Sequence, residues 1–254
     1  MKDNKSNIIS TGNEKMDKLL GGGFKRKEVN IVASRPGEGK TVLLFDIAKN
    51  IANQGNFKVY YMHTDAFDKK ILKHKNISYN GDNYFFCNDY NRLIGDLKRW
   101  GADVVIIDTL NKGSNPWIEA DESQFYHLSK IAKEFNVAII VSNELDRSMY
   151  ERRNREPTVD DLRIQGDYQE FVSNIILIKS KFASIADILE YPLLLDEYRF
   201  ENKTICVYDN KKKEIGHFQM EINYEDNTNE VISRAKFDEL YEKYEEAMKI
   251  LQGN

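Results

Sequence analysis

The sequence has few of the features that mark secreted, membrane-spanning or zinc-binding proteins. It contains only 2 cysteines among 254 residues, and Cys87 and Cys206 stand far apart, in no CxxC or Cys/His grouping. A disulfide framework and a zinc site are therefore not supported, and a reducing cytoplasm is the simplest interpretation. The first ten residues are polar and no apolar run reaches the length of a membrane span, so we expect a soluble cytoplasmic protein, in the host cytoplasm if it is viral, without membrane contact.

The chain also lacks an excess of basic charge. Its formal net charge is −4, so any nucleic-acid binding has to come from a local positive patch. Hydrophobic residues make up 41% and charged residues 31%, which suits one α/β domain with a sizeable core. We expect a flexible arm over residues 1–9, the domain over residues 10–226 with a mainly helical insert at about 184–200, and a C-terminal amphipathic helix over 227–254.

What the chain does contain is a phosphate loop between a strand and a helix. The stretch VNIVASRPGEGKT, residues 29–41, runs from an apolar strand through a glycine-containing loop into a helical pattern. Glycines let backbone N–H groups approach a triphosphate, and the N-terminus of the helix favours an anion. Lys40 is placed for the β- and γ-phosphates and Thr41 for Mg²⁺. The spacing therefore predicts ATP and Mg²⁺ binding rather than an ordinary strand-turn-helix. The predicted nucleotide-binding residues are Ser34, Arg35, Pro36, Gly37, Glu38, Gly39, Lys40 and Thr41, with Ser34 where the GxxxxGK[ST] pattern has glycine.

Acidic and polar residues end the strands that follow. Asp108 closes the apolar strand ADVVIIDTL, as expected of a carboxylate that holds Mg²⁺ through water. Asp65 ends the strand KVYYMHTD and either orients and deprotonates an attacking water or caps the next helix, and the sequence leaves both open. The strand NVAIIVSN ends at Asn143 and Glu144, one of which we predict to sense the γ-phosphate.

An arginine-rich loop comes next. The stretch LDRSMYERRNREPTVDDLRIQGDYQE carries Arg147, Arg152, Arg153, Arg155 and Arg163. Such a positive site in an acidic protein suits phosphate contacts, although charge alone favours a surface loop whose arginines pair with nearby carboxylates. Two predicted strands, KTICVYD and GHFQMEINY, then complete the sheet and are separated by the polar segment NKKKEI. The final helix packs either on its own domain or on a neighbouring subunit.

In this order, the segments resemble the RecA-type ATPase domain of DnaB-family replicative DNA helicases. The resemblance runs from about Ser10 to Asp226 and includes a small residue at position 34 followed by Arg-Pro. HTDAFDKKI matches the region where that family carries its catalytic glutamate, with Asp65 in its place. The stretch ELDRSMYERRNREPTVDDLRIQG is the most specific match. The resemblance implies an α/β, RecA-like P-loop NTPase fold with a mainly parallel central sheet and helices on both faces.

The resemblance also implies a function: an ATP-dependent DNA translocase or helicase acting on single-stranded DNA in replication. It implies a homo-oligomeric ring, such as a hexamer, and replisome proteins as further partners. The implied catalytic residues are Lys40, Thr41, Asp65, Asp108, Glu144 and Lys211, with Thr41 and Asp108 as Mg²⁺ ligands. The implied DNA-binding residues are Arg147, Arg163, Ile164 and Gly166, of which the last three lie in the stretch that lines the central pore in relatives.

Three departures from the family keep a second function open. Asp65 is one methylene shorter than the glutamate, and Lys211 stands where relatives place an arginine finger that acts on the neighbour's nucleotide. Lysine lacks the planar bidentate fork of arginine, so hydrolysis could be weak. The helical N-terminal domain with which such helicases bind primase and close the ring is not in this sequence. The alternative is a non-motor, ATP-switched DNA-binding protein, such as a recombination or annealing mediator or a helicase assembly or loading partner.

Overall fold

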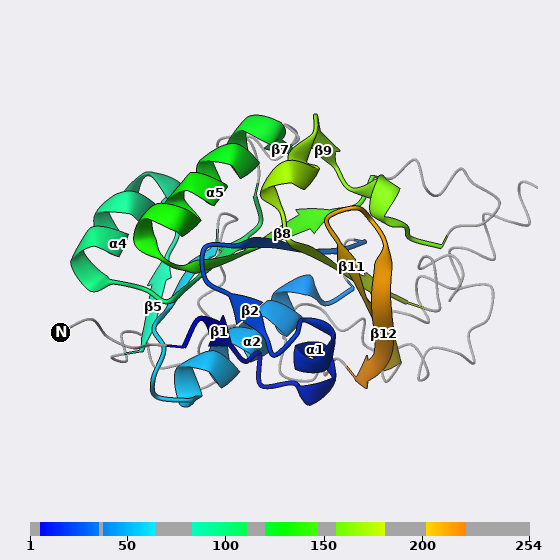
Figure 1. The fold of residues 1–254 in the computed structure, drawn as a ribbon, viewed down its shortest axis with the longest axis horizontal. Helices are drawn as coiled ribbons and strands as arrows, with labels where there is room; N and C mark the ends of the chain where they lie inside the picture. Colours follow the sequence, from blue (N-terminus) through cyan, green and yellow to red (C-terminus); the bar gives the residue numbers. More distant parts are fainter. Residues whose placement is uncertain are drawn as a thin grey trace, which may run out of the picture.

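A computed structural model describes residues 6–35, 38–63, 83–110, 120–146, 156–180 and 202–221. These residues form a central eight-stranded sheet in the order β12-β11-β10-β3-β8-β6-β4-β5 (Figure 1). Its strands are β3 (Val29–Ser34), β4 (Val59–His63), β5 (Tyr84–Cys87), β6 (Val104–Asp108), β8 (Ala138–Glu144), β10 (Asn174–Lys179), β11 (Asn202–Asp209) and β12 (Glu214–Glu221). All neighbours from β10 to β5 pair in parallel, while β11 and β12 add an antiparallel hairpin. The predicted mainly parallel sheet is confirmed.

Helices cover both faces of this sheet, as predicted. In Figure 1, α1 (Glu14–Leu19) and α2 (Lys40–Asn53) lie below the sheet, and α4 (Leu93–Trp100) and α5 (Glu122–Phe135) lie above it. Each face has its own apolar core, so strand residues alternate between the two. In β3, Ile31 packs into the core under α5 and Val32 into the core under α2. Strands buried on both sides read as continuous apolar runs, which explains why the sequence shows them so clearly.

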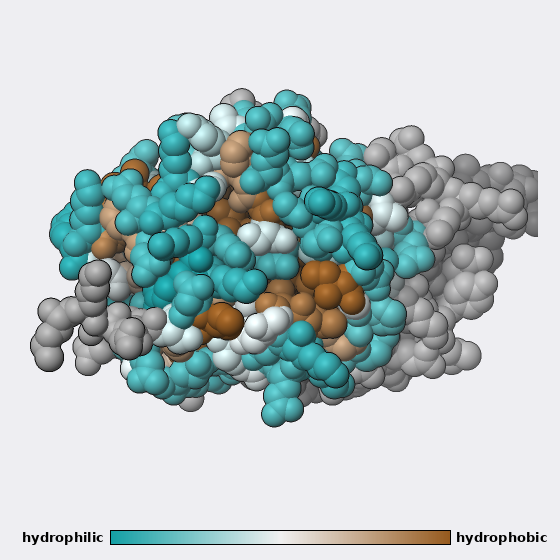
Figure 2. All heavy atoms as spheres, in the orientation of Figure 1, coloured by the Kyte–Doolittle hydropathy of each residue, from teal (hydrophilic) through white to brown (hydrophobic). Residues whose placement is uncertain are grey.

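Short elements connect the layers. The two-residue strands are β1 (Ile8–Ile9), β2 (Phe24–Lys25), β7 (Ala120–Asp121) and β9 (Ile164–Gln165), and the 3₁₀ turns are η1 (Tyr90–Arg92), η3 (Val159–Asp161) and η4 (Tyr168–Phe171). β1 pairs with β2, and β7 pairs with β9. The visible face is mostly hydrophilic, and apolar side chains gather beside the β11–β12 hairpin (Figure 2). Within the described ranges, every helix is too short or too polar to cross a bilayer.

The arm predicted over residues 1–9 is wrong for its last residues. Ile9 is fully buried, and β1 pairs antiparallel with β2. Gly23 makes this pairing possible, because a Cβ at this position would come within 2.2 Å of the Ile9 carbonyl oxygen. The sequence pattern does not reveal the pairing, since β1 is only two residues long. Residues 1–5, the insert at about 184–200 and the helix at 227–254 lie outside the described residues.

A buried ion pair ties β2 to the amino edge of the parallel strands. Arg26 follows β2, and its Nη2 donates to Asp103 Oδ1 over 2.7 Å, with both side chains only 4% exposed. The second oxygen of Asp103 accepts from the Lys58 backbone N–H at 2.7 Å. Arg26 Nη1 also donates to the Asn136 carbonyl oxygen at 2.9 Å, just after α5. Asp103 therefore stands at the start of β6 with both oxygens satisfied.

Removing this carboxylate should destabilise the fold strongly. Asp103→Ala leaves a buried guanidinium and a backbone N–H without their acceptor, and we expect a loss of about 3–5 kcal/mol in the free energy of unfolding, measured by urea denaturation. Asp160→Ala is the matched control, because the Lys212–Asp160 pair is exposed, with 77% of the Asp160 side chain in solvent. We expect less than about 1 kcal/mol there. Equal losses in the two variants would contradict the importance of the buried pair.

Candidate nucleotide site

The predicted phosphate loop lies between the carboxyl end of β3 and the start of α2. Ser34 is the last residue of β3, and Lys40 is the first of α2. Gly39 adopts φ 94°, a left-handed conformation that glycine takes without strain. The α2 cap makes no side-chain hydrogen bond, and the first turn of the helix has no acidic residue. Both features favour an anion at this helix end. Pro36 and Gly37 lie outside the described residues.

Lys40 is a buried cation of this site. It is 8% exposed, and its Nζ donates to the Ser34 carbonyl oxygen at 3.3 Å and to the Arg35 carbonyl oxygen at 3.5 Å. Burial lowers the pKa of Lys40, while the negative charges of Glu144, Asp108 and Glu38 raise it. Three carboxylates from three segments therefore act on one ammonium group. This is the juxtaposition that the strand-end pattern predicts for Asp108 and Glu144.

Asp108 is held by hydroxyl groups from two neighbouring strands. It ends β6 with 1% exposure, and its two oxygens accept from Tyr61 Oη at 3.0 Å and from Ser142 Oγ at 2.6 Å. Burial and the Asp108 charge raise the pKa of Tyr61 well above its usual value, so the phenol stays protonated and donates. His63 lies opposite Asp108 in the pairing of β4 with β6, and its Nε2 is 3.7 Å from Asp108 Oδ2.

Tyr61, Ser142 and His63 are site residues that the sequence motifs do not reveal. Their only signal is their place near the carboxyl ends of the strands that flank β6. His63 and Ser142 are polar residues within otherwise apolar strands, whereas Tyr61 is indistinguishable by pattern from any buried aromatic residue.

The two polar residues at the end of β8, Asn143 and Glu144, point to opposite faces of the sheet. Ile140 of β8 packs in the core under α2, so Glu144, four residues on, lies on the α2 side as well. Glu144 pairs in register with Ser34, and its charge acts on Lys40. Asn143 points to the other side, is 3% exposed, and donates from Nδ2 to the Arg163 carbonyl oxygen at 3.5 Å. Of the two predicted sensor residues, Glu144 is the one on the α2 side of the sheet, where its charge acts on Lys40.

Glu144 also contacts Arg163 of the predicted DNA-binding stretch. The Arg163 backbone N–H donates to the Glu144 carbonyl oxygen at 3.2 Å, and Arg163 Nη1 lies 3.9 Å from Glu144 Oε2. A bridge between Leu145 and Leu162 aligns the two segments. The arginine-rich loop therefore returns to the strand end that flanks the phosphate loop. Arg147 lies outside the described residues.

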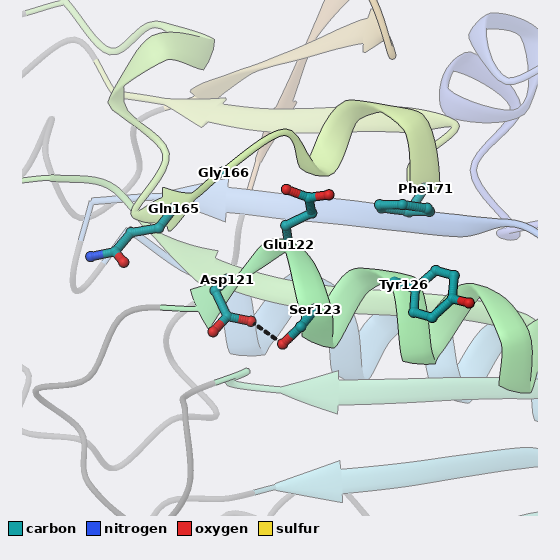
Figure 3. A pocket seen from close by; sticks show the side chains of 7 residues that line it. All are labelled: Asp121, Glu122, Ser123, Tyr126, Gln165, Gly166 and Phe171. Carbon is teal, nitrogen blue, oxygen red and sulfur yellow. Dashed lines mark hydrogen bonds between the residues drawn. The ribbon is translucent and has the colours of Figure 1, made fainter.

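Ile164 and Gly166 lie next to an acidic hollow. Ile164 pairs with Ala120 of β7, and Gly166, at φ 83°, packs so closely on α5 that a Cβ would come within 2.9 Å of Glu122. A pocket of about 610 Å³ opens there, lined by Asp121, Glu122, Ser123, Tyr126, Gln165, Gly166 and Phe171 (Figure 3). Asp121 accepts from Ser123 Oγ at 2.5 Å, and Glu122 accepts from the Asp167 backbone N–H at 3.2 Å. Two carboxylates repel phosphate, so this pocket does not suit the DNA backbone.

Lys211 lies at the opposite edge of the sheet from the phosphate loop. It sits in the β11–β12 turn, where Asp209 Oδ1 accepts its backbone N–H at 2.9 Å. Asp209 pairs with Asn174, which pairs with Asn30 near the start of β3. The four residues from Asn30 to Ser34 span roughly 13 Å, and the turn extends further away. Lys211 therefore does not reach the phosphate loop of its own chain. Asp65 lies outside the described residues.

The described residues suit a magnesium nucleotide better than a protein-only metal site. Within the described ranges, His, Cys, Asp and Glu side chains do not gather in groups of three or more that could hold a metal ion. Magnesium bound to a nucleotide needs only one or two protein ligands besides phosphates and water. Thr41 in the first turn of α2 and Asp108 on the same side of the sheet could supply them.

Two buried tyrosines test the environment of Asp108. Tyr61→Phe removes a donor from a buried carboxylate, and we expect it to lower the free energy of unfolding by about 1–3 kcal/mol. Tyr84→Phe is the control, because the Tyr84 hydroxyl is buried without a hydrogen-bond partner. Its removal should cost less than about 0.5 kcal/mol or stabilise the protein. Chemical denaturation of both variants measures the difference, and the reverse order would refute the Tyr61–Asp108 bond.

Comparison with known proteins supports the fold. Residues 8–81 match the family described as the DnaB-like helicase C-terminal domain. The structure is similar to that of a DnaB-like replicative helicase, with a TM-score of 0.59 and 17% identity over 86% of this chain and 61% of that chain. At this level of identity, the similarity is evidence for the fold alone.

Two curated relatives are similar in sequence. The DNA repair protein RadA of Aquifex aeolicus is 24% identical over 196 residues, covering 72% of this chain and 44% of RadA. The replicative DNA helicase DnaB of Mycoplasma genitalium is 24% identical over 243 residues, covering 75% of this chain and 52% of DnaB. The chain thus spans about half the length of these relatives. The predicted resemblance is confirmed: the chain has the RecA-type ATPase fold and is similar in sequence to the ATPase domain of DnaB-like helicases.

Proposed function

We propose that the chain is the motor part of an ATP-dependent translocase or helicase that acts on single-stranded DNA in replication. One observation carries this proposal: Glu144 pairs in register with Ser34 of the phosphate loop, and its carbonyl oxygen accepts from the Arg163 backbone N–H. A residue that contacts both segments can transmit the state of the nucleotide to the DNA-binding loop. The matching family and the DnaB relative support this choice among the functions that the RecA-type fold serves.

Each described site residue has a role in this proposal. Lys40 and the uncapped N–H groups of α2 hold the phosphates, Thr41 and Asp108 hold Mg²⁺, and Tyr61 with Ser142 fixes the orientation of the Asp108 carboxylate. Bound Mg²⁺ would neutralise charge on the phosphates. Asp65 is the proposed base that orients and deprotonates the attacking water.

Arg163 is the proposed DNA contact, and its link to Glu144 supplies the coupling. The carboxylate of Glu144 is 42% exposed and is shared between the surroundings of Lys40 and Arg163. If Glu144 turns toward the nucleotide, Arg163 loses its acidic neighbour and becomes freer to bind a phosphate of the DNA backbone. Ile164 and Gly166 carry no charge, so in this proposal they would set the course of the backbone next to the DNA.

The position of Lys211 requires a neighbouring subunit for any role at a nucleotide. It lies in an exposed turn at the amino edge of the sheet, away from its own phosphate loop. We therefore propose a homo-oligomeric ring, a hexamer by analogy with the family, in which Lys211 approaches the next subunit's nucleotide. Replisome proteins are proposed further partners, in the cytoplasm.

The similarity to RadA favours one second candidate. RadA is named as a DNA repair protein, and it matches 72% of this chain. Together with Asp65 and Lys211 in place of the family's glutamate and arginine, this supports an ATP-switched, non-motor DNA-binding protein. Such a protein would bind DNA in response to ATP but hydrolyse ATP slowly.

Turnover of ATP distinguishes the two functions. For the motor, we expect ATP hydrolysis that single-stranded DNA stimulates, unwinding of a forked duplex, and a loss of at least about 100-fold in hydrolysis on Lys40→Ala, since a main phosphate-binding charge is removed. Phosphate release and strand separation measure both. ATP-stabilised assembly on DNA with negligible hydrolysis would instead favour the second candidate, and no binding of ATP would exclude both.

The role of Arg163 is tested by the salt dependence of DNA binding. Arg163→Gln should weaken binding to single strands of any sequence and reduce the slope of log K against log salt by about 0.7, the value for one phosphate contact. Arg99→Gln is the control, because Arg99 is 78% exposed on α4, far along the sheet from the phosphate loop. Fluorescence titration at several salt concentrations gives both slopes. An unchanged slope in Arg163→Gln would show that Arg163 does not contact DNA phosphates.

A further inference from the structure

A second buried lysine lies behind the phosphate loop. Lys203, near the start of β11, is only 1% exposed, and its Nζ donates to Ser180 Oγ at 2.8 Å. A buried ammonium is costly unless an opposite charge compensates it. A serine hydroxyl accepts the hydrogen bond but brings no charge. A carboxylate near Lys203 lowers this cost.

Glu38 of the phosphate loop is one such carboxylate, because its charge and that of Lys203 act on each other. It is 4% exposed, its Oε1 accepts from Arg35 Nε at 2.7 Å, and its Oε2 is buried without a hydrogen-bond partner. Burial raises the pKa of Glu38, while the charges of Arg35, Lys203 and Lys40 act in the opposite direction. One carboxylate in the loop therefore faces three cations, and one of these, Lys203, comes from a distant strand.

The connection between β11 and the loop runs through Ser180. Lys179 of β10 pairs with Thr204 of β11, so Lys203 and Ser180 meet at the carboxyl edge of the sheet, where the phosphate loop lies. Arg35 Nη2 donates to the Ser180 carbonyl oxygen at 3.3 Å, and Lys203 binds the hydroxyl of the same residue. Ser180 is thus held by the phosphate loop on one side and by β11 on the other.

We propose that Lys203 is a positioning residue of the nucleotide site, which offsets the charge of Glu38 and holds the phosphate loop through Ser180 and Arg35. The proposal rests on nucleotide binding at this loop, as proposed above. With Lys203 in place, the negative charge of Glu38 does not oppose the phosphates. Without it, the loop presents one positive charge less to a polyanion, and affinity for the triphosphate falls.

A charge cycle between Lys203 and Glu38 tests this proposal. Lys203→Met keeps the length of the side chain but removes its charge, and we expect the Kd for a magnesium complex of a fluorescent ATP analogue to rise by about 10-fold, or about 1.4 kcal/mol. Glu38→Gln removes the opposing charge and keeps an acceptor for Arg35, so the Kd should fall. The double variant should bind close to wild type, because the two effects offset each other. In hydrolysis, Lys203→Met should raise KM more than it lowers kcat.

Three controls separate the outcomes. Lys98→Met, at an exposed position on α4, should leave the Kd unchanged, and thermal melting reports whether each variant is folded. If Lys203→Met does not fold, the double variant, in which the charges of both Lys203 and Glu38 are removed, still has to fold and bind near wild type. Equal binding by wild type and folded Lys203→Met would overturn the proposal, as would a double variant as weak as Lys203→Met, which indicates packing alone. If wild type itself does not bind while melting normally, it is the nucleotide-binding function that fails.

Discussion

The burial of Lys40 among carboxylates is the constraint on which the rest of the site depends. A lysine that is 8% exposed has to be compensated, and the charges of Asp108 on β6, Glu144 on β8 and Glu38 in the loop act on it. Parallel strands make this possible, because their carboxyl ends lie side by side at one edge of the sheet. The sheet is in turn fixed at its other edge, where the buried Arg26–Asp103 pair joins β2 to the start of β6.

The Asp108 carboxylate is held in place by residues that are themselves held by their neighbours. Asp108 faces the α2 side, and the hydroxyls of Tyr61 and Ser142 each satisfy one of its oxygens. Tyr61 in turn stacks on Phe45 of α2, with ring centroids 4.5 Å apart. A carboxylate held from two directions loses little freedom when it takes up its task, which lowers the cost of organising the site on binding.

The parts that can be predicted from the sequence are those set by local patterns. The helix Glu122–Phe135 has the bounds that its sequence predicts, because Asp121 and Gln124 form a capping box and Asn136 ends it in a left-handed conformation. The strands ending at Asp108 and Glu144 are equally clear. Lys203 and Tyr61 are not, because their partners come from strands far away in the sequence and only the register brings them together. The β1–β2 pairing escapes prediction for the related reason that two residues carry no periodicity.

The place of Lys211 shows what sequence order alone cannot supply. Alignment by motif puts it where a nucleotide-contacting arginine would be, but β11 runs antiparallel to β10 and ends at the amino edge of the sheet. Lys203 and Lys211 therefore lie at opposite ends of one hydrogen-bonded strand, the first behind the phosphate loop and the second in the exposed turn. One strand therefore contacts the phosphate loop through Ser180 at its start and leads into the turn that carries Lys211 at its end.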